Sequence, residues 1–289
     1  MATPKILTAR TVITMDPANP RATAVAVAAD GTLAAVGDLA TCQAALPDAP
    51  VTDLGGTVLM PGFIEPHSHP LLSGMGTQSP AIWIAPYVGF PTFADVEAKW
   101  HELHASTPEG QVLLFNGLDR LLQGCEAPTA DSLETYFPGR PVVVVDNSGH
   151  AAYCSQTYVK ELGWDTAAPA DPVGSSFGRH ADGSSNGQAF EMAAVMQMLG
   201  PAMAKAGINP IATAAEWYAL MADHGITSTS EHTYQDNMQP AYEALASFPS
   251  CPLRISLYHV STEATCGDTP TLKADPDLLH KNGVKLWAD

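Results

Sequence analysis

The alternation of apolar and polar residues changes character near residue 60. Residues 5–60 form short β-type stretches, and the apolar runs of residues 22–37 flank Asp30-Gly31, a dipeptide typical of hairpin turns. Beyond them, apolar runs of strand length alternate with helical periodicity, which predicts a mostly parallel α/β sheet. We expect strands at 57–65, 111–119, 141–149, 225–233, 252–260 and 283–289, helices at 92–106, 152–162, 188–206 and 210–224, and a long polar loop at 165–187.

Composition narrows the classes of protein to which the chain can belong. Its 289 residues are 46% hydrophobic and 15% charged, which is typical of a globular protein with a sizeable core. The formal net charge of -17 disfavours binding to nucleic acid or to an anionic membrane, because both require clustered Lys and Arg. The five cysteines include no C-x-x-C pair, and the N-terminus lacks the apolar run of a signal peptide. We therefore expect a reducing, cytoplasmic setting with no nucleic-acid or membrane partner.

The pair His67 and His69 is the first candidate for chemistry. Alternation along an extended chain places both imidazoles on the same side, where they can bind one ion such as Zn²⁺. The bare pattern is equally consistent with two surface histidines at the end of a strand. Its position directly after the apolar strand 57–65 favours a metal site, because α/β barrels carry their functional groups at the carboxyl ends of their strands.

The segment around these histidines resembles a known superfamily. TVLMPGFIEPHSH (57–69), preceded by the hairpin of residues 22–37, resembles the start of an amidohydrolase-superfamily enzyme. SGHAAYCSQTYVKELG (148–163), NGQAFEMAA (186–194) and GVKLWAD (283–289) are similar to the branch of large enzymes that includes N-substituted formamide deformylases. These are metal-dependent hydrolases with a (β/α)₈ barrel and a small β-sandwich.

The resemblance implies an α/β fold with an incomplete TIM-type (β/α)₈ barrel. Residues 1–60 would form a β-sandwich portion that lacks its C-terminal strands, and residues 61–289 a partial metal-dependent hydrolase barrel. An α/β insertion would occupy about 75–210 and contain the strands 111–119 and 141–149. The barrel strands would be 57–65, 225–233, 252–260 and 283–289.

The resemblance also implies the chemistry, which is hydrolysis of an amide, formamide or cyclic amide C–N bond by a metal-activated water. His67, His69 and Lys285 would bind one or two divalent ions, with zinc as the first candidate. Lys285 would act as a bridging carbamate, because a free ammonium group cannot bind a cation. From the residues alone, a lysine in an apolar strand is more simply interpreted as an amine extended to the solvent at the sheet edge.

Three more histidines are candidate substrate contacts. His150 would lie in the insertion, and the alternative is a loop histidine that caps a helix starting near Ala151. Glu191 matches a glutamate of the family, and would orient a pocket loop or face the solvent. His232 and His259 lie at the ends of the predicted barrel strands 225–233 and 252–260, and Glu231 sits beside His232. A solvated loop is the alternative for all three. His101 and His104 lie on the predicted helix 92–106 and are interpreted as surface residues.

The family pattern extends beyond this sequence. Members of the family supply two more histidines and an aspartate that acts as general base, and the general base is not present in this chain. The alternative to a small-molecule amidohydrolase is therefore a catalytically incomplete fragment, or half of a split enzyme without activity of its own. The oligomeric state and the particular amide substrate stay open.

Overall fold

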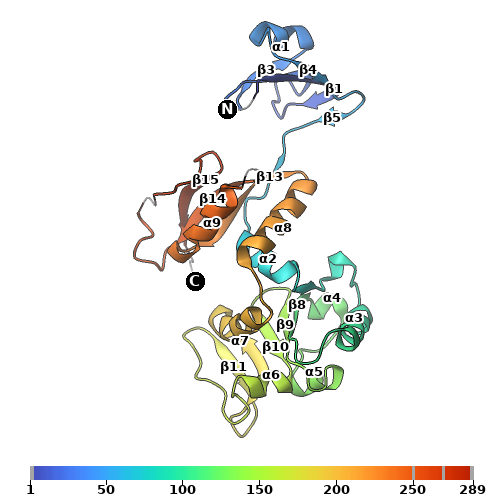
Figure 1. The fold of residues 1–289 in the computed structure, drawn as a ribbon, viewed down its shortest axis with the longest axis vertical. Coiled ribbons are helices and arrows are strands. Elements are labelled where there is room, and N and C mark those ends of the chain that lie inside the picture. The colour runs from blue at the N-terminus through green and yellow to red at the C-terminus, as the bar shows by residue number, and fades with distance from the viewer. Residues whose placement is uncertain (1–2, 249–250, 269–270, 287–289) are drawn as a thin grey trace. The chain divides into compact units, whose positions relative to one another are not determined.

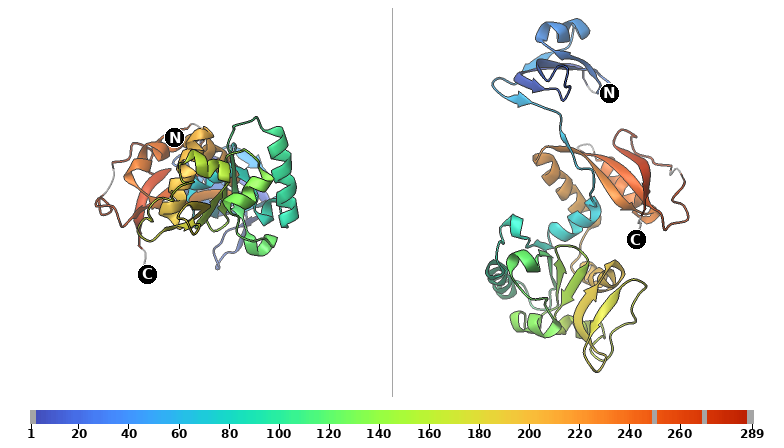
Figure 2. Two further views of the ribbon diagram at one scale, coloured as in Figure 1. Left: turned by 90° about the horizontal axis from the view of Figure 1, so that it is seen from below. Right: turned by 180° about the vertical axis from the view of Figure 1, so that it is seen from behind.

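The computed structural model describes residues 3–248, 251–268 and 271–286, which have a mixed α/β fold (Figures 1 and 2). The chain divides into two compact units, Met1–Ile64 and Glu65–Asp289. Within the described residues, no helix combines the length and the apolar character that crossing a membrane requires.

The first unit is built on a five-stranded mixed sheet. The turn at Gly31, whose φ is +86°, joins two antiparallel strands as the hairpin pattern predicts. The Asp38 side chain caps the helix Leu39–Ala45 by accepting a hydrogen bond from the Thr41 N–H. The elements are β1 (Lys5–Ile13), β2 (Arg21–Val27), β3 (Leu33–Gly37), α1 (Leu39–Ala45), β4 (Val51–Asp53), β5 (Val58–Leu59) and the short β6 (Phe63–Ile64) at the end of the unit.

The second unit contains a six-stranded sheet with helices on both faces (Figure 1). Its central run Val142–Val145 is buried on both sides, as expected for a strand between two helical layers. The strands, in the order of the sheet, are β11 (Ser176–Arg179), β12 (Ser185–Phe190), β10 (Ala151–Cys154), β9 (Val142–Asp146), β8 (Leu113–Leu118) and β7 (Ile82–Trp83). The helices are η1 (Pro86–Val88), α3 (Phe93–Ser106), α4 (Arg120–Gln123), α5 (Ala130–Tyr136), α6 (Gln156–Glu161) and α7 (Met192–Lys205).

Several predicted boundaries in this region are wrong. The helix expected at 152–162 begins as strand β10, and the helix expected at 188–206 begins as β12. The predicted loop 165–187 contains β11 and the start of β12. Strand β10 is four residues long and buried throughout, so its sequence shows no alternation that would separate it from the helix that follows. The helix after β10 is capped by the Ser155 hydroxyl, so the helix-capping alternative for His150 is also wrong.

A parallel sheet in the same unit contains β15 (Leu279–Lys285), β14 (Arg254–Val260) and β13 (Ile226–Tyr234) in that order. Strands β13 and β14 lie close to their predicted ranges. Strand β15 begins four residues before the predicted start at 283, and residues 287–289 of the predicted strand lie outside the described part. One face of the sheet packs on helices through a buried apolar cluster that includes Tyr218, Tyr242 and Leu257. The helices near this sheet are α2 (Pro70–Thr77), α8 (Pro210–Asp223), η2 (Asp236–Met238) and α9 (Gln239–Ala246).

His104 makes the stability of this unit depend on pH. Its Nδ1 accepts a hydrogen bond from Arg140 Nε at 3.2 Å, and burial, followed by the Arg140 charge, lowers the pKa of His104 below 6.5. The folded state therefore binds this proton less readily than the unfolded chain. The contribution of His104 to the free energy of unfolding is complete above about pH 6.5 and is lost as the pH falls through the lowered pKa.

We expect His104→Asn, which keeps an acceptor but does not titrate, to lose less stability than the wild type between about pH 7 and about pH 5. Urea denaturation at several pH values measures this difference. If the free energy of unfolding falls equally with pH in the two proteins, His104 is not responsible for the pH dependence.

Candidate metal centre

The segment 67–69 that carries the two predicted ligands runs alongside β13. The Glu65 N–H donates to the Ser228 carbonyl at 2.9 Å, and the His232 N–H donates to the Ser68 carbonyl at 3.2 Å. These bonds hold the segment extended up to Pro70, which begins helix α2. The two histidines are therefore positioned by backbone pairing at the carboxyl end of β13, where functional groups gather in parallel α/β sheets.

A row of rings crosses this end of the sheet. The His67 ring centroid lies 5.6 Å from that of His69 and 4.4 Å from that of His232. The Tyr258 ring stacks on His232 at 4.3 Å with an interplanar angle of 10°. His232 Nε2 lies 2.8 Å from the Pro66 carbonyl oxygen and must donate to it, because a carbonyl only accepts. The structure thus brings the predicted ligands together with one predicted substrate contact.

Lys285 ends β15 and is the third predicted ligand. It pairs with Val260 of β14, so it lies at the same end of the parallel sheet as the rings. Burial lowers the pKa of His67, and the charges of His232, Lys285 and His69 lower it further. The Lys285 charge therefore acts on His67.

Glu231 is buried and fixes the orientation of His69. Only 1% of the residue is exposed, and its Oε1 lies 3.0 Å from His69 Nδ1. The Tyr242 hydroxyl and the Thr233 N–H also donate to this carboxylate. Burial by itself raises the pKa of Glu231, but the hydrogen bonds from His69, Tyr242 and Thr233 outweigh it and leave the pKa below its usual value. The solvated-loop interpretation of Glu231 is therefore wrong.

The contact with Glu231 selects the tautomer of His69. An ionised carboxylate only accepts, so His69 Nδ1 must carry the proton, which leaves the lone pair on Nε2. Metal-binding histidines commonly have this carboxylate partner on the second ring nitrogen. The donor set therefore fits a divalent metal ion.

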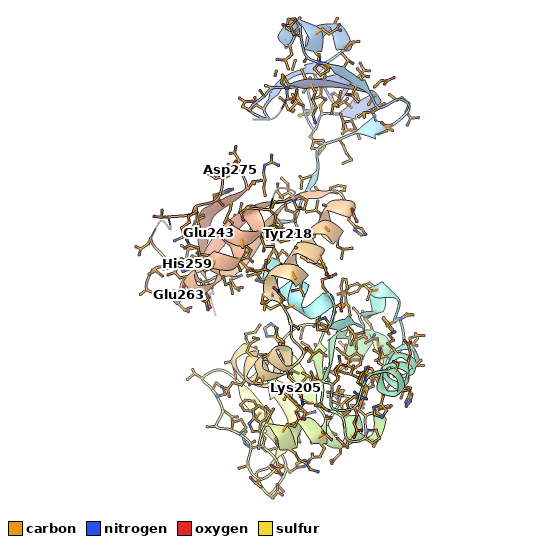
Figure 3. All side chains as sticks on the ribbon, viewed as in Figure 1. Lys205, Tyr218, Glu243, His259, Glu263 and Asp275 are labelled. Carbon is orange, nitrogen blue, oxygen red and sulfur yellow. The ribbon has the colours of Figure 1, made fainter. Side chains whose placement is uncertain are left out.

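His259 does not join the row of rings. Neighbouring residues of a strand point to opposite faces, so His259 faces away from the side on which Tyr258 stacks against His232. It is 1% exposed and lies beside Glu263 (Figure 3). The solvated-loop interpretation is wrong for this residue as well.

His150 and Glu191 pair with each other near the six-stranded sheet. His150 Nδ1 lies 2.6 Å from Glu191 Oε2, and the Glu191 N–H donates to the His150 carbonyl at 2.8 Å. Glu191 has a φ of +66°, a strained conformation for a non-glycine residue that often marks a functional site. The adjacent residues Gly149 and Met192 line an apolar cavity of about 130 Å³.

Sequence reasoning did not identify the partners that complete these contacts. Tyr242 lies on α9, a helix that was not predicted, and reaches Glu231 through packing. Glu263 contacts His259 from four residues further along the chain. The four-residue spacing of His259 and Glu263 could have indicated this contact from the sequence. The same spacing is also common in loops in which the two side chains do not meet.

Comparison with known proteins identifies the family. Residues 50–289 match the model of the amidohydrolase family. The chain therefore belongs to the amidohydrolase family, as its sequence motifs predict.

Individual relatives are distant and longer. The chain is 26% identical to Protein LONG AFTER FAR-RED 3 of Arabidopsis thaliana over 302 aligned residues, which cover 98% of this chain and 50% of that protein. It is 30% identical to the N-substituted formamide deformylase of Arthrobacter pascens over 186 residues, which cover 63% of this chain and 33% of the relative. The chain thus spans no more than half the length of these two relatives.

The fold is also found in a solved structure. An uncharacterized metal-dependent hydrolase from Pyrococcus horikoshii OT3 superposes with a TM-score of 0.64 at 15% identity, covering 98% of this chain and 54% of that one. At this identity the likeness shows the fold alone. The chain therefore shares its mixed α/β fold with this solved structure.

Proposed function

We propose that the protein carrying this chain is a metal-dependent hydrolase that cleaves the C–N bond of a small amide, formamide or cyclic amide. The observation that carries the proposal is the placement of His67 and His69 at the end of a parallel sheet, with Glu231 holding the His69 tautomer that can bind metal. Family membership supports hydrolysis, and the deformylase relative supports C–N chemistry. In this proposal the parallel sheet is part of a (β/α)₈ barrel, and the first unit is part of a β-sandwich.

His67, His69 and Lys285 would hold the metal, with zinc as the first candidate. Lys285 would do so as a carbamate, formed when its neutral amine adds to CO₂ and loses one proton. The product carries an anionic oxygen where the ammonium group carried a positive charge, which makes it a ligand. A bound divalent ion would polarise the carbonyl oxygen of the substrate and would lower the pKa of water, so that hydroxide is available as a nucleophile near neutral pH.

The residues around the ligands would supply orientation and shape. Glu231 holds His69, and Tyr242 and Thr233 hold Glu231, so the imidazole is fixed before metal arrives. His232 and Tyr258 stack on each other beside His67 and would give one side of the site an aromatic wall. Such rigid support keeps the ligand geometry within the narrow range that a metal site tolerates.

Replacing Glu231 with Gln is expected to weaken zinc binding by about 10–100-fold, because the partner that orients a ligating histidine is lost. A glutamine side chain cannot accept from both His69 and Tyr242 as a carboxylate does. Zinc affinity measured by competition with a chromophoric chelator tests the expectation. Glu216→Gln, an exposed residue on α8, is the matched control. Equal affinities for both variants would contradict the role of Glu231.

The proposed activity is tested with the complete gene product and a panel of formamides, amides and cyclic amides. We expect C–N bond cleavage, followed as the appearance of a new amino group, that a chelator abolishes and that added Zn²⁺ restores. Carbamylation of Lys285 is tested separately, by comparing zinc content with and without bicarbonate and by the Lys285→Ala variant. C–N bond cleavage that is indifferent to chelators would overturn the proposal.

A further inference from the structure

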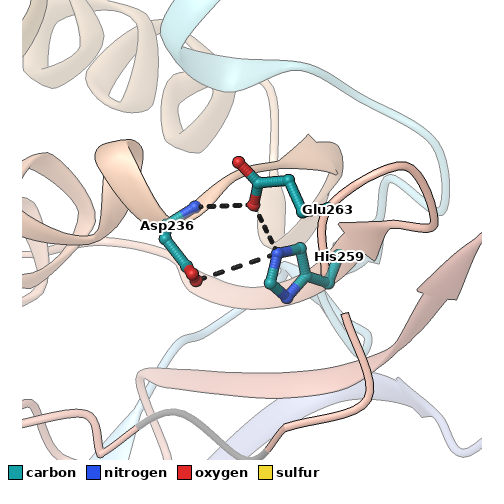
Figure 4. A group of neighbouring side chains, drawn as sticks. All are labelled: Asp236, His259 and Glu263. Atoms are coloured by element: carbon teal, nitrogen blue, oxygen red, sulfur yellow. Dashed lines mark hydrogen bonds and ion pairs between the residues drawn. The ribbon is translucent and has the colours of Figure 1, made fainter. Parts of the chain in front are cut away.

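We propose a second divalent-cation site, formed by Asp236, His259 and Glu263, which takes a zinc-like ion and joins the segments that follow β13 and β14. The nitrogen and oxygen atoms that these three side chains offer all lie within 4.8 Å of one another (Figure 4). They come from the start of η2, the end of β14 and the turn that follows it. An imidazole with two carboxylates is a donor set suited to Zn²⁺ or Mn²⁺.

The distances leave a place for an ion between the side chains. His259 Nε2 lies 3.7 Å from Asp236 Oδ1, too far for a hydrogen bond, and 2.6 Å from Glu263 Oε2. Ligand atoms about 2.0–2.2 Å from a tetrahedral zinc ion lie roughly 3.3–3.6 Å apart, close to the first of these distances. Glu263 has to move outward, and its side chain is 31% exposed, so it has room to do so. The ion then takes the place of the proton on Nε2.

The charges at the cluster favour a cation. Glu263 Oε2 also accepts from the Asp236 N–H at 3.1 Å, and Asp236 Oδ2 accepts from the Thr265 hydroxyl at 2.7 Å. These two partners are neutral. Among the contacts that the described residues make with the two carboxylates, the imidazole supplies the positive charge, and it carries at most one. A divalent ion would complete the neutralisation. The Thr265 contact also fixes the Asp236 carboxylate from behind, as expected for an oriented ligand.

The nitrogen at the centre of the cluster is held in place. His259 is 1% exposed, and its ring packs edge to face on Tyr234 with 5.2 Å between ring centroids. A buried imidazole directed at two carboxylates is therefore preorganised, whereas the carboxylates approach from the solvent side. Such an arrangement lets an ion enter without any rearrangement of the strand.

The site is independent of the proposed catalytic centre. His259 and Tyr258 are neighbours on β14 and point to opposite faces, and Tyr258 belongs to the row of rings with His232 and His67. An ion at the cluster would therefore act as a structural crosslink between two loops at adjacent strand ends. This role does not depend on catalysis, so it can be tested even if the proposed hydrolase activity is wrong.

The test uses the 289-residue chain in which His67→Asn and His69→Asn remove the catalytic-site imidazoles. After metal is stripped with a chelator, Zn²⁺ is titrated against a chromophoric competitor, and thermal unfolding is followed with and without Zn²⁺. We expect this double variant to bind about one equivalent of Zn²⁺ and to unfold at a higher temperature in its presence.

Adding Asp236→Asn or Glu263→Gln should weaken that binding at least tenfold and abolish the thermal shift. Asp277→Asn removes the same charge from an exposed position outside the cluster and should change neither. Circular dichroism confirms that each variant is folded. The proposal is overturned if the double variant binds no Zn²⁺, or if its affinity is the same with and without the Glu263 carboxylate.

Discussion

Replacing His67 with Asn is expected to weaken metal binding at the proposed catalytic centre by at least about 100-fold, with a parallel loss of C–N bond hydrolysis. Loss of a partner behind a ligand already costs about 10–100-fold, so loss of the ligand itself must cost at least as much. His232 Nε2 donates to the Pro66 carbonyl, so this nitrogen is not available as a substitute ligand. Zinc content per chain after dialysis against a defined free concentration measures the effect.

The control must distinguish the loss of a metal ligand from the loss of any histidine. His101 lies exposed on α3, and His101→Asn should leave the zinc content unchanged. The second site proposed above retains its own ion in both variants, so the result is the difference in zinc content between them. If His67→Asn and His101→Asn hold the same amount of zinc, the ligands have been misassigned and the proposed mechanism fails with them.

The sequence could predict the strands that end at the candidate site. Short stretches rich in β-branched and aromatic residues place β13 and β14 within about two residues of where the structure has them. The helix expected at 210–224 is observed as α8, with Asn209 as its cap and Gly225 just beyond it. These elements are encoded by short-range patterns, which is why they can be read without any knowledge of the tertiary fold.

The environment of the site could not be predicted in the same way. Glu231 lies near the end of β13 and looks solvent-exposed in sequence, yet it is buried and accepts a hydrogen bond from Tyr242 of α9. His259 likewise depends on Asp236 and Glu263, which come from two different loops. Contacts of this kind arise from packing between elements, and no local period records them. Alternation does indicate the face of β14 on which His259 lies, but not what covers that face.

Arg140 illustrates a structural role that sequence reasoning missed altogether. The residue is 6% exposed, and all of its guanidinium nitrogens are engaged. Nη1 donates to the carbonyls of Pro108 and Gln111 at 2.8 and 3.1 Å, and Nη2 to those of Thr107 and His104 at 2.8 and 3.2 Å. These carbonyls lie at and just beyond the end of α3, where a helix leaves its last carbonyls without partners.

We expect Arg140→Met to lower the free energy of unfolding by roughly 3–5 kcal/mol. Methionine keeps most of the apolar stem but leaves four carbonyls without their charged donor, and hydrogen bonds to charged groups contribute about 1.5–3 kcal/mol each before water recovers part of the loss. Arg140→Lys should recover only a fraction of the lost free energy of unfolding. A single ammonium group cannot reach all the carbonyls that the two terminal nitrogens of the guanidinium contact.

Urea denaturation of the two Arg140 variants and of Arg120→Met measures this expectation. Arg120 is 43% exposed and pairs with Asp146 at 3.3 Å, so its loss should cost at most about 1 kcal/mol. A cost for Arg140→Met as small as that for Arg120→Met would mean that water replaces the guanidinium at the end of α3. A large cost confined to Arg140 would instead show that one buried cation holds α3 and the turn after it against β9, one of the two central strands of the six-stranded sheet.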